Sequence, residues 1–158
     1  MADYLRDELG RVLDQYDERR RAIQAREQKV RDEDALFIAG FAELRRSVVR
    51  PVFELAAAML AERGHKVAIV EQEFAVDAGS KVTEAEIAIR IVPAGTQAPP
   101  DGEHARAFSI STRHYNKTVW INAGKPLEGA KGTYPLARID RQLVEEQLVG
   151  FVAGIVGG

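Results

Sequence analysis

Apolar residues recur along the first fifty positions of the chain at steps of three and four residues. The series passes through Arg19, Arg26 and Glu33. Its apolar members are Leu5, Leu9, Val12, Tyr16, Ile23, Val30, Phe37, Phe41, Leu44 and Val48. An apolar repeat of about 3.5 residues is typical of a coiled-coil seam. Because a lone helix with so narrow an apolar stripe is marginal in water, we expect another subunit, or the chain folding back on itself, to cover this seam.

The helical pattern separates the chain into two parts. We assign 1–34 to a helical oligomerisation segment and 35–158 to an α+β head domain, because the apolar face widens from Ala35 onward, as it does where a helix meets a core. The expected oligomerisation residues are Leu5, Leu9, Val12, Tyr16, Ile23 and Val30. Asp32 or Asp34 could cap a second helix, but no glycine or proline lies nearby, so we favour one continuous helix.

Proline and glycine mark the later part of this helix. Pro51 lacks a backbone donor and should kink the helix without ending it, since helical spacing resumes after it. Gly64 suits a C-terminal cap. Arg45, Arg46 and Arg50 lie near the helix middle, where they fit a solvated face or, alternatively, a stripe that binds phosphate.

Beyond the helix the apolar period changes to two, which predicts four strands. They are expected at 66–76, 82–92, 105–115 and 118–123. In the second of them Ile87, Ile89 and Ile91 point to one face, and Glu86 and Arg90 point to the other. One buried and one wet face are typical of an antiparallel sheet.

The remaining segments are connections and a final helix. Turns and loops are expected at 77–81, 93–103, 116–117 and 124–135. Asp140 is a plausible N-cap, with Ile139 placed to pack against the first turn of the helix that follows. The order predicts an α+β fold with a long N-terminal, coiled-coil-like helix, a four-stranded antiparallel sheet and a C-terminal helix packed on the sheet.

Composition limits the function classes. The chain of 158 residues fits one domain, and the lack of cysteine excludes disulfides, thiolate metal sites and a cysteine nucleophile. No apolar run approaches the ~20 residues of a membrane helix, and the charged N-terminus does not resemble a signal peptide. We therefore expect a cytoplasmic protein with no membrane partner. The net charge of −2 does not indicate an anionic partner. Arginine outnumbers lysine 16 to 6, which suggests a GC-rich bacterial genome.

Known catalytic and cofactor motifs are not recognisable in the sequence. His65, His104 and His114 have no second ligand at helical or strand spacing. The segment GKPLEGAK at 124–131 resembles a phosphate-binding loop but lacks the hydroxyl residue and the immediate helix. We therefore expect no catalytic residue, no cofactor and no metal site.

The acidic residues offer one alternative to this expectation. Two carboxylate pairs could oppose one another across a hairpin, namely Glu71 with Glu73 and Glu84 with Glu86. They could perform acid–base chemistry, or they could simply form an exposed acidic face. Charge is also unevenly distributed, because 67–103 carries a net −5 and the next 38 residues carry +5. Cross-strand pairing or an acidic partner would explain this asymmetry.

The hairpin at 104–125 is the candidate binding surface. With a turn at 116–117, Arg113 opposes Trp120, the only tryptophan, on the wet face. The residues expected to bind a partner are Arg113, Tyr115, Trp120 and Asn122. The arginine and tryptophan could form a cross-strand cation–π pair, an interface hot spot or a base-stacking platform.

We therefore expect a non-catalytic adaptor or scaffold protein that forms a homo-oligomer, or pairs with another coiled-coil protein, through its N-terminal helix. Its head would bind a protein partner. One alternative is a nucleic-acid-binding protein that uses the basic hairpin at 104–125. A second alternative is a small-molecule enzyme that uses the paired carboxylates.

Overall fold

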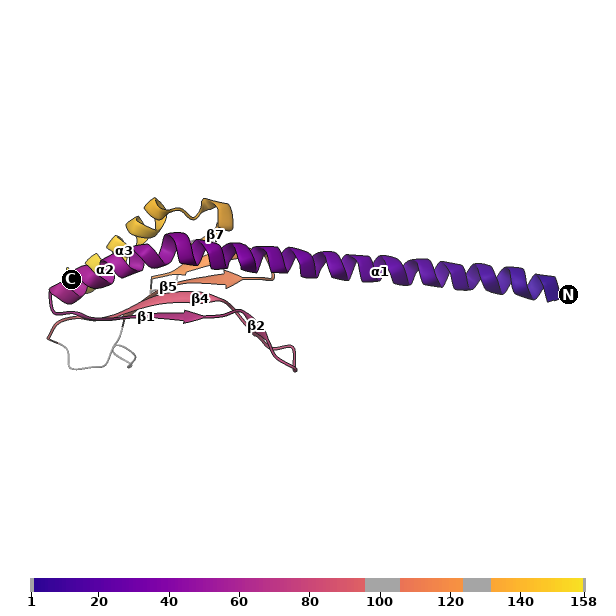
Figure 1. Cartoon of the computed structure of the whole chain (residues 1–158), viewed down its shortest axis with the longest axis horizontal. Helices are drawn as coiled ribbons and strands as arrows, with labels where there is room; N and C mark the ends of the chain where they lie inside the picture. The colour runs from indigo at the N-terminus through magenta and orange to yellow at the C-terminus, as the bar shows by residue number, and fades with distance from the viewer. Residues whose placement is uncertain (1, 96–105, 124–131, 158) are drawn as a thin grey trace. The chain divides into compact units, whose positions relative to one another are not determined.

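The structure is a computed structural model that describes residues 2–95, 106–123 and 132–157. Within them the chain forms an N-terminal helical run, a five-stranded antiparallel sheet and a C-terminal helix (Figure 1). The chain divides into two compact units, Met1–Leu36 and Phe37–Gly158. In the described residues no helix has the length and apolar character required to cross a membrane.

The N-terminal helical run has no break. It consists of α1 (Ala2–Leu44), a π-helix (Arg45–Val49) and α2 (Arg50–Glu62). The expected continuity through residues 31–37 is therefore confirmed. Pro51 does not end the helix, but the structure accommodates it with a widened turn, in which the Arg50 N–H donates to the carbonyl of Arg45. Gly64 follows α2 with a φ of 88°, as expected of a residue at a helix C-terminus.

The main sheet has five strands, one more than the sequence predicted. They lie in the order β1 (Lys66–Gln72), β4 (Glu86–Val92), β5 (Arg106–Arg113), β6 (Thr118–Asn122) and β7 (Thr133–Pro135). The three residues of β7 lie where a loop was expected, because so short a strand carries no alternating pattern. The two long predicted strands each divide, and their outer parts form a separate two-stranded sheet of β2 (Ala75–Val76) and β3 (Val82–Thr83).

Side chains explain where the long strands divide. The carbonyl of Gln72, the last residue of β1, accepts a hydrogen bond from the Arg45 guanidinium at 3.2 Å. Ala85, the residue before β4, donates its N–H to the hydroxyl of Thr112 on β5 at 2.9 Å. These contacts end the ladder between β1 and β4, and the chain continues into β2 and out of β3.

The helices cover one face of the main sheet and form the core with it (Figure 1). The ring of Phe108 on β5 contacts Phe53 of α2 at 5.8 Å and Phe151 of α3 (Arg141–Val156) at 5.6 Å between centroids. The expected packing of the C-terminal helix on the sheet is thus confirmed. Asp140 caps α3 by accepting a hydrogen bond from the Leu143 N–H at 2.8 Å. The predicted isoleucine before it, Ile139, is buried.

Candidate functional site

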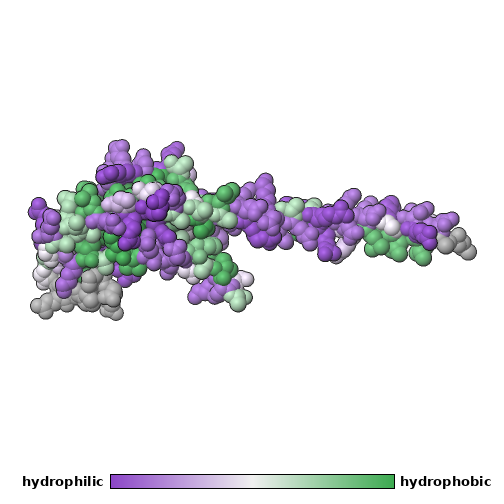
Figure 2. All heavy atoms as spheres, viewed as in Figure 1, coloured by the Kyte–Doolittle hydropathy of each residue, from purple (hydrophilic) through white to green (hydrophobic). Residues whose placement is uncertain are grey.

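The six predicted oligomerisation residues lie on α1, and all are exposed in the single chain. Their exposed fractions range from 48% for Val12 to 64% for Leu5. No described side chain between residues 3 and 36 is buried, and Figure 2 shows hydrophobic side chains scattered among hydrophilic ones along this helix. Coiled-coil pairing stays a prediction, but the apolar side chains that it requires are accessible.

The hairpin of β5 and β6 has a different register from the predicted one. Arg113 pairs with Thr118, and Ser111, rather than Arg113, pairs with Trp120. The connection is a four-residue turn, 114–117, because Lys117 adopts a positive φ of 53° and donates its N–H to the carbonyl of His114. The shift of two residues leaves every side chain on its predicted face, since faces alternate with a period of two.

Three of the four predicted partner-binding residues form one cluster on this hairpin. The guanidinium of Arg113 lies 4.3 Å from the ring centroid of Trp120, so the cation–π pair exists as a diagonal contact. Arg113 also donates a hydrogen bond to the hydroxyl of Tyr115 at 2.8 Å. Asn122, the fourth residue, is on the same face of β6, because it follows Trp120 by two positions. Whether a partner binds this cluster stays a prediction.

The sheet face that carries the cluster is lined by small side chains. The register places Ala88 on β4 and Ser109 on β5 side by side, and both are buried although they lie on the face opposite the helices. Arg90 and Arg113 lie on the same face, and the Nε atom of each is buried without a hydrogen-bond partner among the described residues. The predicted wet face is therefore only partly exposed.

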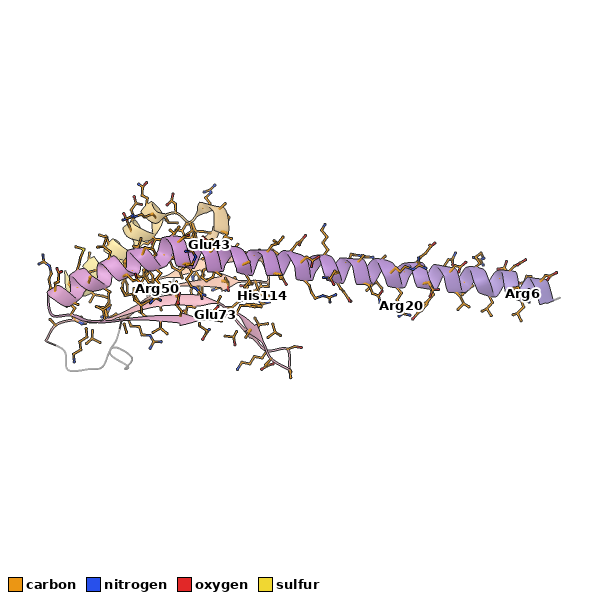
Figure 3. The ribbon with its side chains drawn as sticks, in the orientation of Figure 1. Arg6, Arg20, Glu43, Arg50, Glu73 and His114 are labelled. Carbon is orange, nitrogen blue, oxygen red and sulfur yellow. The ribbon has the colours of Figure 1, made fainter. Side chains whose placement is uncertain are left out.

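The helix arginines are paired with carboxylates, which disfavours the phosphate-binding stripe. Arg45, predicted to be solvated, is instead buried, and its guanidinium lies 3.1 Å from Glu71 and 2.6 Å from Glu73. Arg50 lies 3.2 Å from Glu71. Figure 3 labels Arg50 and Glu73 in this part of the head. Arg46 is exposed, and its hydrogen bond to Glu43 raises the pKa of the guanidinium.

The predicted carboxylate pairs do not meet. Glu71 pairs in register with Ile87, so it points to the helix side, whereas Glu86 lies opposite Gln72 and points to the other side. Glu84 contacts neither of them in the described structure. Instead its carboxylate accepts a hydrogen bond from the hydroxyl of Thr112 at 3.1 Å. Glu71 and Glu73 both contact the Arg45 guanidinium, so the members of the first pair lie close together, whereas the two pairs stay apart. Acid–base chemistry at these glutamates stays a prediction.

Glu84 forms a contact that the sequence analysis missed. Its Oε2 lies 2.9 Å from Nδ1 of His114, and the His114 ring packs against Phe74 with centroids 5.5 Å apart. A carboxylate at Nδ1 orients an imidazole, as it does in many catalytic and metal sites. No cluster of three potential metal ligands occurs in the described part of the chain, so this pair alone supplies no metal site. Thirty residues separate the two side chains, and no local pattern indicates the contact.

An apolar groove between α2 and α3 also escaped the sequence analysis. Its volume is about 560 Å³, and most side chains along it are apolar, although Arg63, His65 and Glu145 also line it. Leu55 and Met59 on α2, and Val149 on α3, line it and are all more than half exposed. A hint of the groove is present in the sequence, because Leu55, Met59 and Val149 make the apolar faces of both helices wider than one sheet can cover.

Two predicted features lie outside the described residues. They are His104 and the segment 124–131 that resembles a phosphate-binding loop. Comparisons of the whole chain with protein-family models, with curated proteins and with solved structures found no match. Interpretation of this protein therefore depends on its own geometry.

Proposed function

We propose that this protein is a non-catalytic adaptor that self-associates through the seam of α1 and presents its head to a protein partner. The observation that supports the proposal is the exposed seam, defined as Leu5, Leu9, Val12, Tyr16, Ile23 and Val30. Six exposed apolar side chains at coiled-coil spacing on one helix are explained by a second helix that covers them.

The size of the seam indicates a moderate affinity. Each seam side chain is about half exposed, so covering it contributes about 1 kcal/mol. Two helices together, with twelve seam side chains, would gain about 12 kcal/mol, which is similar to the roughly 4–15 kcal/mol that association costs. Arg19 and Arg26 interrupt the seam, and polar residues at such positions fix register while they weaken the assembly. We therefore expect a dimer whose population depends on concentration.

The cluster of Arg113, Tyr115 and Trp120 is the proposed partner surface of the head. These residue types predominate in interface hot spots, and Tyr115 is 64% exposed. The Arg113 guanidinium already covers one face of the Trp120 ring, so the cluster is ordered before a partner arrives. An ordered cluster loses less entropy on binding than a mobile one.

Size-exclusion chromatography with light scattering, recorded at 260 and 280 nm, tests the self-association. We expect the native chain to form dimers at high concentration and Ile23→Glu to dissociate at least ~30-fold more readily, since two buried isoleucines contribute about 2 kcal/mol. Ala25→Glu is the matched control, because it adds the same charge to the same turn outside the seam. A native chain that stays monomeric at all concentrations would refute the proposal.

The same chromatography tests the nucleic-acid alternative. That alternative predicts a raised absorbance at 260 nm that falls as salt is increased, because phosphate contacts release counterions. The adaptor proposal predicts no such absorbance.

For the head, Tyr115→Ala should release a co-purified protein partner, whereas Ile23→Glu should leave the partner bound to the monomer.

A further inference from the structure

The orientation of the two helices can be derived from the charges along α1. We infer that the second chain lies antiparallel to the first through residues 5–30, with Leu5 facing the partner's Val30 and Val12 facing the partner's Ile23. This inference depends on the proposed self-association and adds its geometry. It uses only residues that precede Phe37, whose side chain is buried within the head.

The polar positions of the seam exclude the parallel arrangement. In a parallel, in-register pair each seam residue faces its own copy, so Arg19 would face the partner's Arg19, and Arg26 the partner's Arg26. Like charges held a few ångströms apart in a partly dehydrated seam repel. The Arg19 contact would fall near the middle of the overlap, where fraying cannot relieve it.

The antiparallel arrangement removes both repulsions. With Val12 facing the partner's Ile23, the same alignment places Arg19 against the partner's Tyr16 and Arg26 against the partner's Leu9. A guanidinium over a tyrosine ring is a favourable cation–π contact. The long stem of Arg26 can cover the partner's Leu9 while its charge reaches water. Every apolar seam residue then faces either an apolar residue or an arginine stem.

The residues that flank the seam support the same alignment. In an antiparallel pair, flanking positions face flanking positions of the same kind. This places Arg6 beside the partner's Glu27, and Glu8 beside the partner's Lys29. Opposite charges at flanking positions set partner orientation in coiled coils. Twofold symmetry repeats each pair, so four ion pairs border one interface. Glu8 bonds Arg11 at 2.8 Å in the single chain, but both side chains are exposed enough to rearrange.

Neighbouring antiparallel alignments are less favourable. A shift of one heptad toward the N-terminus places Arg6 beside the partner's Arg20. The opposite shift places the carboxylate of Glu33 against the partner's Leu9, where it would lose part of its contact with water. The alignment that pairs Val12 with the partner's Ile23 is therefore the one in which seam and flanking charges agree.

Disulfide trapping tests this geometry, because the chain contains no cysteine and every thiol can be placed by design. In the antiparallel alignment, Val12→Cys/Ile23→Cys brings thiols together across the interface, whereas Val12→Cys alone does not. We expect the double variant to give a covalent dimer on non-reducing gels after mild oxidation. Each single variant should remain a monomer on the gel. Ala25→Cys, outside the seam, is the matched control and should not cross-link.

Each other outcome overturns the inference in a recognisable way. Covalent dimers of the single variants Val12→Cys and Ile23→Cys would show a parallel pair, because each residue would then face its own copy. A dimer in light scattering that none of the variants can trap would reject this alignment while the proposed self-association remains valid. A monomer in light scattering would reject both.

Discussion

Arg45 contacts two carboxylates that differ in distance and in burial, so it can show which of these properties sets the strength of an ion pair. Its Nη2 lies 2.6 Å from Glu73, and its Nε lies 3.1 Å from Glu71. The Glu73 side chain is 74% exposed, whereas that of Glu71 is 31% exposed. Distance alone would make the Glu73 pair the stronger one, and burial would favour the Glu71 pair.

We expect burial to decide. Solvent-exposed ion pairs contribute about 0–1 kcal/mol, because water screens them and the long side chains lose entropy. A hydrogen bond to a charged group that is partly withdrawn from water contributes about 1.5–3 kcal/mol. The coupling free energy between Arg45→Met and Glu71→Gln should therefore be about 1.5–2 kcal/mol. The coupling between Arg45→Met and Glu73→Gln should be below about 1 kcal/mol.

Urea unfolding followed by circular dichroism, at one fixed protein concentration, measures these couplings through two double-mutant cycles. The concentration must be fixed because self-association would stabilise the folded chain by mass action. Arg45→Met alone should cost about 2–3 kcal/mol, since it also leaves the Gln72 carbonyl without its donor. A Glu73 coupling that equals or exceeds the Glu71 coupling would refute the reasoning.

Three further changes have defined outcomes. Gly40→Ala places a Cβ 2.6 Å from Cδ2 of Leu136. The gain of about 1 kcal/mol in helix propensity should therefore be lost, because the Leu136 side chain must move. Urea unfolding should show that this gain returns in a Leu136→Ala background. Asp140→Ala should cost about 1 kcal/mol in thermal unfolding, and Asp140→Asn should cost much less, because asparagine also accepts the capping hydrogen bond. Arg113→Gln should uncover one face of the Trp120 ring and move the tryptophan fluorescence emission to longer wavelength. It should also lower the free energy of unfolding by about 0.5–1 kcal/mol. An unchanged emission would show that the guanidinium does not shield the ring.

Local patterns in the sequence were sufficient to predict the two long helical segments and the coarse order of long helix, antiparallel sheet and C-terminal helix. The absence of breakers between residues 31 and 37 predicted the unbroken α1, and Asp140 predicted the start of α3. The alternation of Ile87, Ile89 and Ile91 predicted the buried face of β4, where all three are fully buried. These features depend on neighbours within a few positions, which is the range that a pattern can report.

Features that depend on distant residues were not predictable in this way. The division of the first two predicted strands depends on Arg45, which bonds Gln72 from a different element. The hairpin register depends on Lys117 adopting a positive φ, which is uncommon for a lysine. The face of Trp120 was nevertheless predicted, because an error of two residues preserves the alternation of faces.

The candidate site shows the same distinction. The seam and the aromatic cluster were identified from spacing, because each lies within one helix or one hairpin. The contact between Glu84 and His114 joins two strands thirty residues apart, and the groove between α2 and α3 requires two helices that meet only in the folded head. The contact has no short-range pattern in the sequence, and the broad apolar faces of the two helices do not by themselves show that both border one groove.

The π-helix at Arg45–Val49 absorbs an inserted residue in the helical run. Phe41 and Phe53 are both fully buried in the core, yet they are twelve positions apart, which in an unbroken α-helix would separate their directions by about 120°. The widened turn takes up one residue, and a spacing that behaves as eleven positions separates them by only about 20°. The segment is therefore one residue longer than the core requires. Removal of the exposed Ser47 would leave an ordinary α-helix with both phenylalanines still directed into the core.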